Sequence, residues 1–280
     1  MSTKIKSHAK LNLALNITGK SYSLHKIETI VAFISLHDEI FIKKIKSKKH
    51  KILFTGKFST NISSNNSVSK LFKILELKKL LKNKNFKIRI NKLIPSKAGL
   101  GGGSMNAASI LKYLVKKKII KVTRKELMTI SKLIGSDVVL GLNMTNSILN
   151  EKNKMRYFYN YKRFYVLIVK PNFGCSTKEI YSKVRKFIKP KFNRPRKKMF
   201  DFNYLKEMEN SLEPIVLSKY RKLRTIKLFL ENLPSTFFVR MTGSGSALVA
   251  YFQSKERCEE AKKLFKRKYK KYWCISSKTI

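Results

Sequence analysis

Residues 91–111 have the sequence N-K-L-I-P-S-K-A-G-L-G-G-G-S-M-N-A-A-S-I-L, in which glycine occupies four of the five positions from 99 to 103. Just upstream, Phe86, Ile88 and Ile90 alternate with polar residues, and this alternation predicts a strand. From residue 107 onward, apolar residues recur at the spacing of a helix face. The sequence therefore predicts a strand, a glycine-rich loop and a helix in direct succession.

Such a loop is suited to binding phosphate. Glycines let the backbone approach a ligand closely because no Cβ stands in the way. The first turn of a helix also presents unpaired N–H groups and the positive end of the helix dipole, and together these features form a phosphate cradle. A Walker loop needs Gly-Lys-Ser/Thr and a dinucleotide fingerprint needs G-x-G-x-x-G, so the G-x-G-G-G spacing excludes both. From this loop alone, a flexible glycine turn without a ligand stays open as the alternative.

The composition limits the class of protein. A length of 280 residues allows one large domain or two medium ones. No apolar run reaches about 18 residues, so no transmembrane helix is predicted. Residues 1–10 are polar and basic with no apolar segment behind them, which predicts a cytoplasmic protein without a signal peptide. Cys175, Cys258 and Cys274 are widely spaced and odd in number, so we expect reduced thiols that are buried or half-exposed, and no disulfide or zinc site.

The charge is extreme, with 63 lysines and arginines against 16 acidic residues and a formal net charge of +47. Such a field attracts any polyanion, including RNA. The basic residues are nevertheless spread along the whole chain, whereas a dedicated nucleic-acid domain concentrates them on one helix or tail beside aromatic residues. Lysine, isoleucine, asparagine and phenylalanine are all abundant, which is typical of proteins encoded by adenine- and thymine-rich genes. We therefore predict only non-specific contact with nucleic acid, and no membrane partner.

Other elements follow from periodicity and capping. Alternation around residues 11–15 predicts a strand that places Lys10 and Asn12 together on its opposite face. A capping box at Thr123–Glu126 predicts the start of a helix. We also expect strands at 30–45 and 51–58 with a turn at 35–39, helices at 68–81, 217–230 and 254–272, a buried strand at 164–169, an exposed loop at 189–198, a hairpin at 237–252 and a final strand at 273–280. No chemical role is assigned to Asp38 in the expected turn.

Three motifs resemble the GHMP kinases, the family of galactokinase and of homoserine, mevalonate and phosphomevalonate kinases. P-x3-G-L-G-G-G-S at 95–104 is similar to their ATP-phosphate loop, I-G-S-D-V-V at 134–139 to L-G-A-D-V-P, and R-M-T-G-S-G-S at 240–246 to a motif that packs against that loop. Their order and spacing agree, so the chain is identified as a member of this superfamily. The resemblance implies a two-domain α+β fold, with a ribosomal-protein-S5-like domain at 1–155, a ferredoxin-like α/β sandwich at 156–280 and the active site in the interdomain cleft.

Four shorter matches resemble one branch of this family. They are A-K-L-N-L at 9–13, S-L-H-K-I-E-T at 23–29, P-x5-T-x3-Y at 171–181 and N-S-L-E-P at 210–214. This branch phosphorylates the 2-hydroxyl of 4-diphosphocytidyl-2-C-methyl-D-erythritol in the non-mevalonate route to isoprenoids. The resemblance implies ATP and Mg²⁺ as cofactors, a cytidine diphosphate sugar alcohol as substrate, and a monomer or homodimer. Two alternatives stay open: another small-alcohol kinase of the homoserine or mevalonate type, and a basic RNA-binding protein on this fold that has lost kinase activity.

The resemblance also implies roles for individual residues. Asp137 is the expected catalytic base, since a base must reach the reacting hydroxyl within a hydrogen bond. Lys10 is expected beside it, where an ammonium keeps the carboxylate ionised and stabilises developing negative charge. No metal ligands are assigned, because Mg²⁺ is expected to bridge the nucleotide phosphates. The expected ATP-binding residues are Pro95, Lys97, Ala98, Gly99, Leu100, Gly101, Gly102, Gly103 and Ser104. The expected substrate-binding residues are Asn12, His25, Thr177, Tyr181, Thr242, Gly243 and Ser244.

Three of the departures from the family pattern change side chains with expected chemical roles. Leu24 stands where the family has a tyrosine that stacks on the cytosine base, and leucine has no π-system. We expect Tyr181 to supply that aromatic platform instead. Met105 and Asn106 stand where a serine and an aspartate are usual, which removes a hydroxyl and a carboxylate, although asparagine can still cap a helix.

Overall fold

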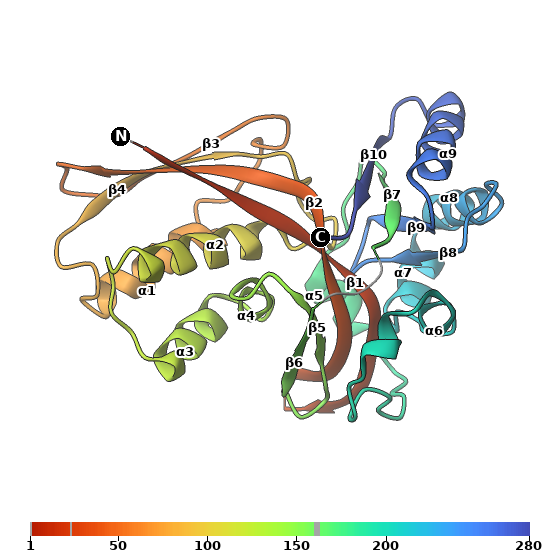
Figure 1. The fold of residues 1–280 in the computed structure, drawn as a ribbon, viewed down its shortest axis with the longest axis horizontal. Coiled ribbons are helices and arrows are strands. Elements are labelled where there is room, and N and C mark those ends of the chain that lie inside the picture. The colour runs from red at the N-terminus through yellow and green to blue at the C-terminus, as the bar shows by residue number, and fades with distance from the viewer. Residues whose placement is uncertain (1, 23, 160–162) are drawn as a thin grey trace. The chain divides into compact units, whose positions relative to one another are not determined.

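The computed structural model describes residues 2–22, 24–159 and 163–280. Its helices and strands form two compact units that alternate along the chain (Figure 1). The first unit comprises Met1–Ala9, Leu36–Ser96 and Gly101–Met144, and the second comprises Lys10–Ser35, Lys97–Leu100 and Thr145–Ile280. Both units are discontinuous in sequence, and the expected domain division between residues 155 and 156 stays a prediction.

Two long strands contribute residues to both units. β1 spans Thr3–Ser21 and β2 spans Leu24–Ile45, and the two strands pair with each other (Figure 1). The first strand expected from alternation is therefore confirmed. The turn expected at 35–39 is wrong, because β2 continues through it and from residue 39 pairs antiparallel with Asn85–Asn91, which is β4.

The predicted succession of strand, glycine loop and helix is present: the strand and the helix belong to the first unit, whereas residues 97–100 of the loop belong to the second. β4 pairs in parallel with β3 (Lys51–Thr55), which ends earlier than expected where Gly56 takes a φ of +89°. The capping box is confirmed, since Thr123 and Glu126 each accept a hydrogen bond from the N–H of the other. The helices of the first unit are α1 (Ser67–Leu77), α2 (Gly102–Lys116), α3 (Arg124–Ile134) and α4 (Val138–Gly141).

The core of the first unit joins these helices to the sheet. Ile88 from β4 is buried in one cluster with Leu71 from α1, Ile110 from α2 and Ile130 from α3. Burying such large apolar side chains stabilises a fold by about 1.5–3 kcal/mol each. The helix that follows the glycine loop therefore rests on a packed support.

The second unit contains a small antiparallel extension of β2 and a separate four-stranded sheet. β5 (Asn146–Leu149) pairs with β2 and with β6 (Met155–Phe158). The separate sheet is built from β7 (Tyr165–Lys170), β8 (Phe238–Met241), β9 (Leu248–Phe252) and β10 (Trp273–Lys278), in the antiparallel order β10-β7-β9-β8. This confirms the buried strand, the hairpin and the final strand. The helices are α5 (Thr177–Ser182), α6 (Phe202–Lys206), α7 (Glu213–Lys219), α8 (Arg221–Glu231) and α9 (Lys255–Lys268), with a 3-10 turn at Lys197–Phe200.

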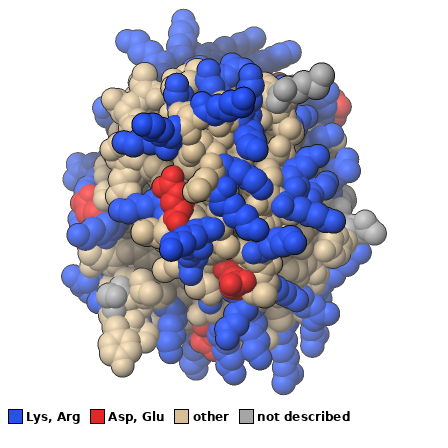
Figure 2. Space-filling model, turned by 90° about the vertical axis from the view of Figure 1, so that its left-hand side faces the viewer, with Lys and Arg blue, Asp and Glu red and all other residues tan. Residues whose placement is uncertain are grey.

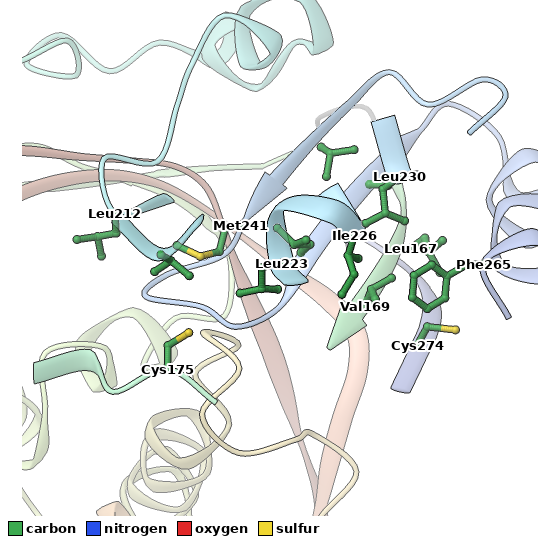
Figure 3. Close-up of a cluster of buried hydrophobic side chains, with 14 of the residues drawn as sticks. Leu167, Val169, Cys175, Leu212, Leu223, Ile226, Leu230, Met241, Phe265 and Cys274 are labelled. Atoms are coloured by element: carbon green, nitrogen blue, oxygen red, sulfur yellow. The ribbon is translucent and has the colours of Figure 1, made fainter. Parts of the chain in front are cut away.

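The core of the second unit lies where α8 and α9 meet this sheet (Figure 3). Leu167 and Val169 from β7 are buried in one cluster with Ile226 and Leu230 from α8 and Phe265 from α9. The polar turn between β8 and β9 is connected directly to this core, so its position follows from the packing of the sheet.

The three cysteines are buried and free. Burial raises the pKa of the Cys175 thiol to about 11 and that of the Cys258 thiol to about 12, so both stay uncharged at neutral pH. Throughout residues 2–22, 24–159 and 163–280, the helices are too short or too polar to cross a membrane.

One expectation for the second unit is confirmed with an exception, and another is wrong. The loop expected at 189–198 is exposed at most of its residues. It is nevertheless anchored at one point, because Phe192 is buried and the N–H groups of Lys191 and Phe192 donate to the Glu28 carboxylate at 2.7 and 2.9 Å. A buried carboxylate needs such donors, and this requirement outweighs the polar composition of the loop. The helix expected at 217–230 is interrupted at Tyr220, whose ψ of 81° separates α7 from α8.

Candidate active site

The first half of the glycine loop, residues 97–100, is fixed within the second unit by its carbonyl groups. Between β8 and β9, the Ser246 N–H donates to the Lys97 carbonyl at 3.2 Å and the Ala247 N–H to the Ala98 carbonyl at 3.3 Å. The Thr242 hydroxyl donates to the Gly99 carbonyl at 3.2 Å. The Lys10 N–H of β1 donates to the Leu100 carbonyl at 3.1 Å. The turn between β8 and β9 therefore packs against the glycine loop, as the resemblance implied.

Gly99 is required because this loop and this turn touch backbone to backbone. Its φ is +73°, and a Cβ at Gly99 would lie 1.9 Å from the Thr242 carbonyl oxygen. From the turn, Gly243 has a φ of +55°, and its Cβ position would lie 3.1 Å from the Gly99 carbonyl oxygen. The first half of the loop is thus a packed element of the second unit, which argues against the alternative of a flexible turn.

Replacing Gly99 with alanine is expected to lower the free energy of unfolding by more than about 1 kcal/mol, since alanine at positive φ is strained and its methyl group would overlap Thr242. The matched control is Gly103→Ala, because the Cβ position of Gly103 lies 3.6 Å from Ser67 Oγ, an ordinary contact. Thermal unfolding of both variants measures the difference. Equal melting temperatures would contradict the close packing at Gly99.

Lys10 and Asn12 belong to a buried chain of polar groups on β1. Each is 3% exposed, and the Lys10 ammonium donates to the Asn12 amide oxygen. The Asn12 amide nitrogen donates to the Thr29 hydroxyl at 2.9 Å, and this hydroxyl donates to the Ala14 carbonyl at 2.6 Å. The Asn12 N–H donates to the Thr242 hydroxyl at 3.0 Å. Asn12 therefore holds the Lys10 ammonium in a defined place near the turn, in addition to the substrate contact predicted for it.

Three side chains that the sequence did not single out support the turn between β8 and β9. The Asn210 amide donates to the carbonyls of Met241 and Gly243, each at 2.8 Å. The Glu213 carboxylate accepts the Met241 N–H at 2.6 Å, and the buried Arg240 guanidinium donates to a carbonyl of β1 at 2.6 Å. The N-S-L-E-P motif contains Asn210 and Glu213, but no local pattern indicates that they bond this turn.

Thr177 and Ser244, both predicted to bind substrate, are brought together in the second unit. Their hydroxyl oxygens lie 2.8 Å apart. Thr177 is exposed at the start of α5, whereas Ser244 is 9% exposed in the turn between β8 and β9. Two hydroxyls from distant segments thus form one polar pair beside the glycine turn.

His25 and Tyr181, predicted to recognise the cytidine end of the substrate, are also neighbours. Their ring centroids lie 5.3 Å apart, with the planes tilted by 51°. Burial, together with the charge of Lys20, lowers the pKa of His25 from its usual 6.5. At neutral pH the imidazole is therefore neutral, with one nitrogen that donates and one that accepts. In the same motif Leu24 is 75% exposed, while Ser23 lies outside the described residues.

The second half of the loop opens α2 in the first unit. Gly101 precedes the helix with a φ of +69°, and residues 102–104 form the first helical turn. This turn contains no acidic residue, and among the described residues no side chain caps it. Its N–H groups and the helix dipole can therefore bind an anion. Upstream in the chain, Pro95 is buried and Lys97 is exposed.

Asp137 immediately precedes α4 in the first unit. α4 packs closely on α2, since a Cβ on Gly141 would lie 2.6 Å from the Cβ of Ala108. This contact ties the partly exposed Asp137 to the helix that begins in the glycine loop. Lys10 belongs to the second unit, so its predicted place beside Asp137 stays a prediction.

A buried ion pair supports the same helix and was missed from the sequence. Asp38 is fully buried and Lys92 is 4% exposed, and the Lys92 ammonium pairs with the Asp38 carboxylate. Asp38 also accepts the N–H groups of Leu93 and Ile94, at 2.8 Å each, and the side-chain amide of Asn106 at 2.9 Å. Asn106 therefore bonds Asp38 from within α2 and does not act as a helix cap. The available signal was a carboxylate inside an apolar strand, which requires burial partners.

Sequence comparisons relate the whole chain to known kinases. The model of the GHMP kinases N terminal domain matches residues 66–149. A 4-diphosphocytidyl-2-C-methyl-D-erythritol kinase from Pelagibacter ubique is 54% identical over 279 residues, which cover 100% of this chain and 99% of that protein. The kinase of the same name from Clostridium tetani is 33% identical over 288 residues, covering 99% of this chain and 100% of that protein.

Solved structures share the fold. A crystal structure of 4-(cytidine 5'-diphospho)-2C-methyl-D-erythritol kinase matches with a TM-score of 0.79 and 21% identity, covering 98% of this chain and 99% of that one. Homoserine kinase from Cytophaga hutchinsonii matches with a TM-score of 0.71 and 14% identity, covering 100% and 94% of the two chains. The α+β GHMP kinase fold expected from the motifs is thereby confirmed. Because it is 54% identical to its Pelagibacter relative over its full length, the chain belongs to the 4-diphosphocytidyl-2-C-methyl-D-erythritol kinase family of GHMP kinases.

Proposed function

We propose that this chain transfers the γ-phosphoryl group of ATP to the 2-hydroxyl of 4-diphosphocytidyl-2-C-methyl-D-erythritol, in the non-mevalonate route to isoprenoids. The observation that carries the proposal is the 54% identity to the Pelagibacter kinase across the full chain. The adjacent rings of His25 and Tyr181 support the choice of substrate. The acceptor substrate of a homoserine or mevalonate kinase contains no nucleobase, so such a kinase would not need these two rings together.

ATP phosphates are expected to bind at the glycine loop. The N–H groups of residues 102–104 would donate to phosphate oxygens, while the hydrogen-bonded carbonyls of residues 97–100 keep the loop in one conformation. Mg²⁺ would bind with ATP and neutralise part of its charge. Within the part of the chain that the structure describes, no group of three or more His, Cys, Asp or Glu residues could hold a metal ion.

The residues then have distinct tasks in the transfer. The Asp137 carboxylate would accept the proton of the 2-hydroxyl as that oxygen attacks the γ-phosphorus. The bond between the γ-phosphorus and its bridging oxygen breaks, and the electron pair leaves with ADP. The Lys10 ammonium, held by Asn12, would stabilise negative charge on the transferred group. Most of the rate enhancement of such a reaction comes from positioning and charge stabilisation.

The proposal is tested by measuring ADP release with Mg-ATP and each of three alcohols: the diphosphocytidyl sugar alcohol, mevalonate and homoserine. We expect turnover with the first alone. Turnover with mevalonate or homoserine instead would keep the kinase chemistry and reject the proposed substrate. Lack of turnover with all three, together with tight RNA binding by the same preparation, would favour the RNA-binding alternative.

The lowered pKa of His25 predicts a specific pH dependence. We expect the affinity for cytidine diphosphate to fall as the pH drops, with a midpoint below 6.5, because protonation converts the accepting ring nitrogen into a donor. Calorimetry as a function of pH measures the profile, with His25→Gln as the control that removes the titration. A midpoint above 6.5 would contradict a neutral imidazole in the site.

The positive charge is expected to give nucleic-acid contact without specificity. Figure 2 shows a face of the molecule on which lysine and arginine side chains far outnumber acidic ones. In the first unit, exposed Lys87 is paired in register with exposed Lys43 and Lys51 on its two neighbouring strands, and an anion would relieve this repulsion. RNA affinity should therefore fall steeply with salt and should not depend on sequence. A cytoplasmic location and a monomer or homodimer stay predictions.

A further inference from the structure

A third aromatic ring accompanies His25 and Tyr181 in the second unit. The ring centroid of Phe187 lies 6.4 Å from that of His25, with the planes tilted by 50°. Tyr181 lies 5.3 Å from the same imidazole at a nearly identical tilt. Neither ring is stacked flat on the imidazole. Among the residues that the structure describes, the histidine predicted to recognise the base therefore has Tyr181 and Phe187 as aromatic neighbours, and the sequence motifs indicated only Tyr181.

The backbone around Phe187 is held by its neighbours in the chain. Val184 is buried in the core of the second unit, and the Ile188 N–H donates to the Ile17 carbonyl of β1 at 3.0 Å. Phe187 lies between these two anchors, so its ring is presented from a fixed segment. A ring presented in this way loses little conformational freedom when it binds a planar ligand.

Phe187 is nevertheless 48% exposed. About half of this large apolar side chain is in contact with water, and covering it with another apolar surface lowers the free energy. A nucleobase is well suited to this, because every base presents a π-face and stacks on aromatic side chains. Leu24, at the position where the family has its stacking tyrosine, is 75% exposed and has no ring.

We propose that Phe187 is a specificity-determining residue of this kinase, whose ring stacks on the cytosine base and takes the part of the tyrosine that Leu24 replaces. Tyr181, to which the sequence motifs assigned that part, then provides the other aromatic contact, and His25 bonds the polar edge of the base. This inference rests on the proposed function, since it requires a cytidine diphosphate substrate. It assigns to Phe187 a contact that the family motifs do not assign.

The test compares Phe187→Ala with the wild-type enzyme. We expect the KM for the diphosphocytidyl sugar alcohol to rise about tenfold or more, which corresponds to the loss of one base–aromatic stack. The KM for ATP and kcat should stay near their wild-type values, because Phe187 is not part of the glycine loop. Binding of cytidine diphosphate alone, measured by calorimetry, should weaken by a similar factor. Phe187→Tyr should retain wild-type affinity.

Two further variants make the inference falsifiable. Tyr22→Ala is the matched control, since Tyr22 is 101% exposed on the same hairpin as His25 and is expected to leave the KM unchanged. If Tyr22→Ala raises the KM and Phe187→Ala does not, Tyr22 is the platform and the inference is wrong. Wild-type affinity in Phe187→Leu would also overturn it, because leucine keeps the bulk without the ring. If the wild-type chain does not phosphorylate the cytidine substrate, the proposed function itself fails.

Discussion

Replacing Asp137 with asparagine is expected to reduce kcat by about 10²- to 10⁴-fold, the contribution typical of a general base. Asparagine has the same shape but cannot accept the proton of the attacking hydroxyl. ATP binding should persist, because the expected donors to the phosphates are backbone N–H groups of residues 102–104. The substitution also removes a negative charge from the first unit, so weaker ATP binding is not expected on electrostatic grounds.

The measurement is steady-state turnover at saturating substrates, with nucleotide binding followed separately by calorimetry. Asp201→Asn is the matched control, since Asp201 is an exposed aspartate that also precedes a helix, at the start of α6. Asp201→Asn should have wild-type kcat. If Asp137→Asn keeps more than about a tenth of the wild-type kcat, the assignment of the base is wrong.

The parts of the site that were predictable from sequence are those with local causes. Alternation in β4, the glycines at 99–103 and the helical spacing after them lie within one continuous segment, and each has a direct physical meaning. The capping box at Thr123 is equally local. The motif that supplies Gly243 is distant in the chain, yet its packing against the loop followed from the family resemblance.

The parts that were not predictable depend on partners far away in the chain. The segment at 35–39 has the residue types of a turn, but the carboxylate of Asp38 is satisfied by groups near Lys92, so β2 continues. Phe192 is buried and its N–H donates to the Glu28 carboxylate, a contact that no local pattern indicates. The same holds for Phe187, which lies in a segment of exposed, mostly basic residues and becomes notable only beside His25.

The second large effect is expected at the buried ion pair of the first unit. Replacing Asp38 with alanine should lower the free energy of unfolding by about 3–5 kcal/mol, because Lys92 is only 4% exposed and its buried ammonium would lose its charge partner. The change also removes the acceptor of two backbone N–H groups and of the Asn106 amide. Urea denaturation of the purified variant measures the loss.

The matched control is an exposed ion pair. The side chains of Arg257 and Glu260 are 57% and 56% exposed, and a guanidinium nitrogen lies 3.1 Å from a carboxylate oxygen. Glu260→Ala should therefore lower the free energy of unfolding by less than about 1 kcal/mol. Replacing Asp38 and Lys92 together with leucine and methionine should be milder than Asp38→Ala, since no charge is then left buried. If Asp38→Ala lowers the free energy of unfolding no more than Glu260→Ala does, the pair of Asp38 and Lys92 does not stabilise the fold.

The same variant connects stability to catalysis. The Cβ position of Gly102 lies 3.2 Å from the Lys92 ammonium nitrogen, and Asn106 joins α2 to Asp38, so this ion pair contacts the start of the helix that presents N–H groups to phosphate. Where Asp38→Ala remains folded, the KM for ATP should therefore rise, whereas the KM for the cytidine substrate should change less. An equal rise in both constants would mean that Asp38 stabilises the first unit as a whole and does not position the glycine loop.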